Sequence, residues 1–194
     1  MDFKKQYLQG FQVCKRLVTE PRQFWRDSLA EGFGYPVVRR IFVPAVFLVA
    51  LAVFIGDWLT DSEFLLSYAF LKAMRELFSY LLQFYLVVLL LTSVLKNMGR
   101  PKARQQIEYL LAYSMVPFLA ASFITGLFPA LYVLGVFGLY GFYLLVVGIQ
   151  ETLSLPKESQ SRFVFLAVLL IILIFAIVNI VSWKLLMAFF PYGA

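Results

Sequence analysis

The sequence predicts an all-α integral membrane protein, a bundle of five transmembrane helices preceded by an amphipathic, interfacial helical leader. Three observations predict this class: the composition, the apolar runs and the placement of the cations. The chain is 62% hydrophobic and 14% charged over 194 residues, whereas a soluble domain is roughly 45–50% apolar and about 25% charged. A chain this short cannot bury such an excess of apolar side chains in a water-soluble core.

Five apolar runs define the membrane domain. A spanning helix needs about 20 mostly apolar residues, and we expect spans at 37–59, 71–95, 107–127, 129–151 and 162–184. Residues 109–150 carry no charge, and this run is too long for one span and right for two. Gly126 and Pro129 mark the turn between them. The chain therefore divides into a leader, residues 1–36, and a five-span domain, residues 37–194.

The Lys and Arg residues predict the orientation, because cationic loops stay on the cytoplasmic side of a membrane. Of the 17 cations, 14 lie in the leader, at the start of the first span, or in the loops after the second and fourth spans. The N-terminus is therefore expected in the cytoplasm and the C-terminus outside, which is the periplasm in a bacterium. The same distribution explains the net charge of +6, and we expect no nucleic-acid partner.

The leader has an apolar stripe at helical spacing. Its members are Phe3, Tyr7, Phe11, Cys14 and Val18. Two interpretations stay open: this helix lies on the anionic inner leaflet, or it packs against its own bundle. Pro21 suits the first turn of a second, short helix. Phe24 and Trp25 are expected to anchor that short helix at the lipid surface.

Catalytic residue types are scarce in this chain. Histidine is absent, which removes the commonest general base and metal ligand, and the single cysteine cannot form an internal disulfide. Asp57 and Asp61 are explained as capping and solvated residues at the outer end of the first span. We expect no enzyme, no catalytic residue, no cofactor and no bound metal.

One candidate cluster remains, at the predicted inner ends of the third and fourth spans. Its members are Glu108, Tyr109, Tyr113, Pro117, Tyr140, Tyr143, Gln150 and Glu151. Spacings of three and four place them on one face of each helix, and a tight antiparallel hairpin would bring the two faces together. Arg104 is four residues before Glu108 and can pair with it. The cluster is either packing between helices or a ligand or ion site.

The fourth span also has four glycines on its surface. Gly135, Gly138 and Gly141 are spaced by three residues, and Gly148 follows two turns later. A dinucleotide-binding motif would need a preceding strand, which this span lacks. The glycines therefore predict a face where another helix approaches closely, within the chain or across a dimer.

Three of these segments together resemble the Yip-domain family of five-span membrane proteins, which interact with Ypt/Rab GTPases. The segments are PRQFW at 21–25, EYLLAYSMVP at 108–117, and GLYGFYLL at 138–145 followed by Gly148. The resemblance implies a cytoplasmic N-terminus and no enzymatic activity, with roles in vesicle trafficking and membrane shaping in eukaryotic members. The short leader resembles the prokaryotic members, which implies a bacterial plasma (inner) membrane.

The expected function is that of a non-enzymatic scaffold or adaptor in membrane organisation or trafficking-like processes. The alternative is a small transporter or channel for an ion, a lipid or a small solute. An odd number of spans without an evident repeat would require a dimer for transport. The expected partners are membrane lipids, together with either a protein partner or a second copy of the chain.

Overall fold

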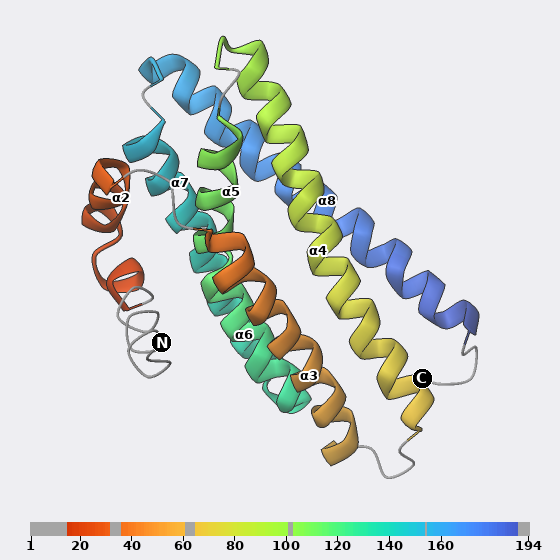
Figure 1. Cartoon of the computed structure of the whole chain (residues 1–194). Helices are drawn as coiled ribbons and strands as arrows, with labels where there is room; N and C mark the ends of the chain where they lie inside the picture. Colours follow the sequence, from red (N-terminus) through yellow and green to blue (C-terminus); the bar gives the residue numbers. More distant parts are fainter. Residues whose placement is uncertain (1–14, 32–35, 61–64, 101–102, 154, 190–194) are drawn as a thin grey trace.

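The fold is a helical bundle, seen in a computed structural model that describes residues 15–31, 36–60, 65–100, 103–153 and 155–189 (Figure 1). These residues contain no strand. Five of the helical segments are long and apolar enough to span a membrane. They are Val38–Thr60, Leu66–Asn97, Arg104–Leu127, Pro129–Thr152 and Lys157–Ala188. The predicted fold class and the number of spans are confirmed.

Two spans are longer than the hydrophobic runs predicted. Helix α4 (Leu66–Asn97) has 32 residues and α8 (Lys157–Phe189) has 33. At 1.5 Å per residue they reach about 48–50 Å, well beyond a hydrocarbon core of roughly 30 Å. The first turns of α4 contain Lys72, Arg75 and Glu76, and ion pairs within the protein let the helix continue through these charges.

The other three spans are each interrupted along their length. In the first, the π-helix η1 (Val38–Phe42) leads into α3 (Val43–Thr60). In the third, α5 (Arg104–Ser114) and α6 (Val116–Leu127) meet at Met115. In the fourth, the 3₁₀-helix η2 (Pro129–Leu139) leads into α7 (Tyr140–Thr152). Pro44 and Pro117 lie just after the first two interruptions and lack the N–H that a regular α-helix would use there.

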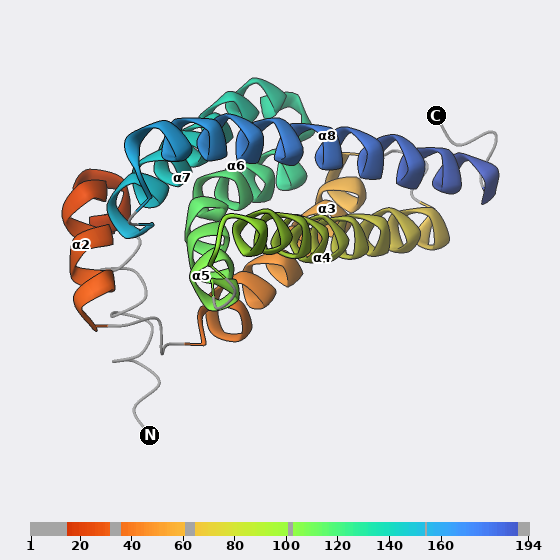
Figure 2. The same ribbon diagram turned by 90° about the horizontal axis from the view of Figure 1, so that it is seen from above.

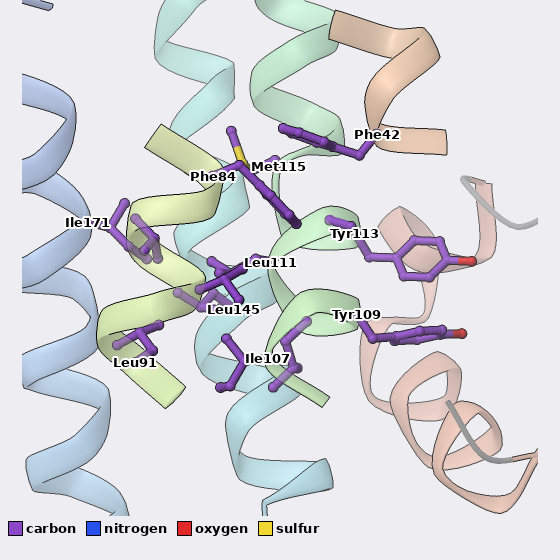
Figure 3. Close-up of a cluster of buried hydrophobic side chains, with 14 of the residues drawn as sticks. Phe42, Phe84, Leu91, Ile107, Tyr109, Leu111, Tyr113, Met115, Leu145 and Ile171 are labelled. Carbon is purple, nitrogen blue, oxygen red and sulfur yellow. The ribbon is translucent and has the colours of Figure 1, made fainter. Parts of the chain in front are cut away.

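Helix α2 (Pro21–Glu31) lies at the edge of the bundle beside α5 and α7 (Figures 1 and 2). We call this end of the bundle the leader end. The far end is the opposite one, where α3 ends, α4 begins and α6 turns into η2 (Figure 1). The core runs between the two ends and includes Phe42 stacked on Phe84, with ring centroids 4.1 Å apart (Figure 3).

The outward faces of the long helices are apolar. Exposed side chains include Phe47 and Leu51 of α3, Phe78 and Leu89 of α4, and Ile172 and Ile180 of α8. In water such a surface would be an aggregation hazard, and in a bilayer it is the surface that contacts lipid. The fold and the surface both define a multi-pass membrane protein.

Helices α3 and α6 cross at two glycines. A Cβ atom added to Gly56 would lie 1.9 Å from the backbone oxygen of Gly126, and one added to Gly126 would lie 3.0 Å from Val53 Cγ2. Only hydrogen atoms fit between the two backbones at this point. Small residues at such crossings allow the close packing that holds membrane helices together.

We expect Gly56→Ala to destabilise the bundle by on the order of 1–3 kcal/mol, because the methyl group must push two backbones apart. The unfolding free energy in mixed detergent micelles, measured by titration with a denaturing detergent, checks this. Gly135→Ala is the matched control, since no atom lies within 4 Å of a Cβ at Gly135. Equal stability of the two variants would contradict the tight crossing.

Candidate functional site

The leader end is organised around the side chain of Trp25. Trp25 is completely buried, and Phe24 beside it is 6% exposed. The Trp25 ring meets Tyr109 and Tyr113 edge to face, with centroids 6.3 and 6.2 Å away, and Phe24 meets Tyr113 at 5.1 Å. Figure 3 shows both tyrosines pointing from α5 toward α2. Four aromatic rings therefore fasten α2 to α5.

Gly148 provides the space that Trp25 occupies on α7. A Cβ atom at this position would lie 2.8 Å from Trp25 Cε2 and 2.5 Å from Leu110 Cδ2. Any larger residue would displace the indole or the neighbouring helix. The Trp25 Nε1–H group has no hydrogen-bond partner among the described residues, so packing alone holds the ring.

Polar contacts surround this aromatic centre. Arg26 Nε donates to Glu151 Oε2 at 2.8 Å, and this hydrogen bond, together with the charge of Glu151, raises the pKa of the Arg26 guanidinium. The guanidinium therefore stays protonated at every physiological pH. The Tyr140 hydroxyl donates to the Val18 carbonyl at 2.9 Å, which ties α7 to the helical residues before α2.

The prediction that Phe24 and Trp25 anchor the leader at the lipid surface is wrong. Both side chains are buried against apolar residues of α5 and α7. The structure instead has this part of the leader packed against its own bundle. Phe3, Tyr7 and Phe11 lie outside the described residues.

The leader contacts residues of both predicted tyrosine stripes. Helix α2 lies against both of them, so Tyr109 and Tyr113 contact Phe24 and Trp25, while Glu151 pairs with Arg26.

The other members of the predicted cluster lie apart from this centre. Glu108 pairs with Arg104 at 2.9 Å, as the four-residue spacing predicted. Pro117 belongs to α6 beyond the break at Met115. Gln150 and Tyr143 are exposed, and the Tyr143 ring lies 5.3 Å from Tyr140.

Three of the four glycines in the fourth span pack against neighbouring helices, and one does not. A Cβ at Gly138 would lie 2.7 Å from Phe118 Cδ2, and one at Gly141 would lie 2.4 Å from the Ser114 carbonyl oxygen. With Gly148, these positions pack within the chain against α5 and α6. Gly135 faces open space and does not share this role.

The far end holds a polar feature that the sequence reading missed. Asp57, expected as a capping or solvated residue, is buried within α3 and accepts a bond from Lys72 at 2.5 Å. Asp61 lies outside the described residues. The sequence did contain one signal for this polar feature. Lys72, Glu76 and Tyr80 lie at steps of four along α4 and therefore share one helix face.

The fold, the apolar surface and a leader helix locked onto the bundle define a multi-pass helical membrane protein. The chain matches the Yip1 domain over residues 15–180. It therefore belongs to the Yip1-domain family, as the resemblance of its three motifs indicated. Neither a curated protein nor a solved structure matches the chain.

We expect Trp25→Ala to release α2 from the bundle. Emptying a fully buried indole site costs about 3–5 kcal/mol, and backbone amides of residues 21–31 should exchange with deuterium roughly a hundredfold or more faster. Hydrogen exchange of the micelle-bound protein, read by mass spectrometry, measures this directly.

Arg26→Gln is the matched control on the same helix. Its ion pair with Glu151 is largely solvent-exposed on the arginine side, and such pairs contribute little to stability. Exchange of α2 should therefore stay close to wild type in this variant. Unchanged exchange in Trp25→Ala would show that the aromatic contacts do not hold α2.

Proposed function

We propose that the protein is a non-enzymatic membrane scaffold that presents helix α2 as a fixed binding surface on the cytoplasmic side. The observation that carries this proposal is the docking of α2. One face of the helix is buried through Phe24 and Trp25, and the opposite face stays open. A helix that served only to cover the bundle would not need such firm orientation.

The open face of α2 has a mixed chemical character. Its exposed residues are Arg22, Gln23, Arg26, Leu29 and Ala30. Two cations, an amide and an apolar patch suit recognition of a protein surface, since arginine and apolar side chains together are common in interfaces. Leu29 is 42% exposed although it lies only four residues from buried Trp25.

The charges around α2 support a cytoplasmic orientation. Exposed cations gather at the leader end of the bundle, as expected for the side of a membrane that retains positive charge. They are Lys15, Arg16, Arg22, Arg26, Lys96, Arg104, Lys157 and Arg162. The same cations favour the anionic lipids of a cytoplasmic leaflet. The open face of α2 therefore lies where it can meet both anionic lipids and soluble partners.

The packing at the leader end favours a binding role. Phe24 and Trp25 cover the Tyr109 and Tyr113 side of the cluster that the transport alternative uses. The leader end therefore offers a packed surface for binding rather than a route for a transported molecule. We therefore favour an adaptor in membrane organisation over a transporter at this site.

Site-specific photo-crosslinking in the native membrane tests the scaffold. A photoreactive amino acid at Leu29, on the open face of α2, should capture one defined protein that mass spectrometry identifies repeatedly. The same probe at Phe165, which is 71% exposed on α8, is the control and should capture lipid. The Leu29 adduct should disappear in the Trp25→Ala background, since α2 is then no longer held in place.

The scaffold proposal fails if the probe at Leu29 captures only lipid, as at Phe165. It also fails if the same proteins are captured at both positions. In either case α2 would be a structural cover with no partner of its own.

The orientation has a separate test. In a Cys14→Ser background, Thr60→Cys places a thiol at the far end and Lys96→Cys places one at the leader end. A membrane-impermeant maleimide added to intact cells should label the first variant and spare the second. The reverse pattern would put α2 outside the cell.

A further inference from the structure

A polar cavity of about 240 Å³ opens among α3, α4 and α6 at the far end of the bundle. Its polar lining comes from Asp57, Lys72, Glu76, Tyr80, Ser122 and Thr125. The cavity is separate from the α2 surface, at the opposite end of the spans. Charged and polar groups that converge on a cavity between helices indicate a site where something polar is held.

Asp57 lines this cavity, and one of its two carboxylate oxygens has no donor among the described residues. Its Oδ1 atom accepts from Lys72 Nζ at 2.5 Å. Its Oδ2 atom is buried and has no hydrogen-bond donor among the described residues, and the residue as a whole is 8% exposed. A buried carboxylate oxygen without a donor is disfavoured, and a bound molecule that donates to the Asp57 carboxylate would reduce this cost.

The charges around the cavity already balance. Lys72 pairs with Asp57, and Arg75 pairs with Glu76. A ligand with a net charge would leave one charge uncompensated at this depth. A ligand with an ammonium and an anion would not, and the lysine ammonium has three donors of which one bonds Asp57.

The remaining polar groups suit the same ligand. The Tyr80 hydroxyl donates to Ser122 Oγ at 2.9 Å, which leaves lone pairs on the tyrosine oxygen. The Arg75 guanidinium stacks on Trp183, with its central carbon 5.0 Å from the ring centroid. Tryptophan and arginine together typically mark the level of lipid headgroups. The cavity therefore lies where headgroups and small solutes can both enter.

We propose that the far-end cavity binds a small zwitterion, with its ammonium group on the Asp57 carboxylate and its anionic group on Lys72 Nζ. The phosphoethanolamine group has this chemistry. It can come from the headgroup of a zwitterionic phospholipid or from a free soluble molecule. This inference does not rest on the scaffold role of α2.

Calorimetric titration of the purified full chain in detergent tests the site with three probes. Dihexanoyl phosphatidylethanolamine is the zwitterionic lipid, dihexanoyl phosphatidylglycerol is the anionic lipid of equal chain length, and glycerophosphoethanolamine is the soluble form. We expect the zwitterionic lipid to bind at least tenfold more tightly than the anionic one. Binding of glycerophosphoethanolamine as well would indicate a soluble ligand, and its failure would indicate a lipid headgroup.

The double variant Asp57→Asn/Lys72→Met removes both recognition groups and keeps the charge balance of the site. It should weaken binding of the zwitterionic lipid at least tenfold. Glu158→Gln/Arg162→Met removes an exposed ion pair at the leader end and should leave binding unchanged. Unaltered binding in the Asp57 and Lys72 variant would overturn the proposal.

The wild-type protein alone also decides the question, should the double variant elute as an unfolded species. Equal affinity for the zwitterionic and anionic lipids would overturn the site, as would binding of neither ethanolamine probe. A clear preference for the zwitterion would support it.

Discussion

Close approach of backbones is the constraint on which this structure depends. Lipid is as apolar as the side chains themselves, so helices in a bilayer gain little from burying apolar surface against one another. They are held by packing at short distance instead. The crossing of α3 and α6 shows this most clearly, because Gly56 and Gly126 leave no room for a Cβ between the backbones. Gly141 does the same where α7 passes the end of α5, against the Ser114 carbonyl.

Breaks in the spans then decide where side chains can gather. Because the third span breaks at Met115, α5 and α6 are free to follow different neighbours. Helix α5 packs with α2 and α7, where Tyr109 and Tyr113 receive the leader, while α6 packs with α3. A straight span could not serve both ends of the bundle equally well. The leader end and the far end of the bundle are therefore different environments.

The two ends differ in how they treat polar groups. At the leader end, Trp25 fills the centre and the ion pair of Arg26 and Glu151 lies at the margin, partly in solvent. At the far end the order is reversed, since charged groups line a hollow and Asp57 is buried. A filled, rigid end suits a binding surface for large partners. A hollow, charged end suits a small ligand.

The sequence by itself determined the class, the five spans and the family motifs, because composition and run length reflect the hydrocarbon thickness directly. It also determined the pair of Arg104 and Glu108, which is set by helical spacing alone. Only the tertiary structure decided that Trp25 lies inside, that Gly135 faces open space and that Asp57 lines a cavity. Each of these depends on which helix face meets which neighbour across long sequence separations. Periodicity gives a face but not its partner, so the packing of α2 against α5 and α7 could not be derived from it.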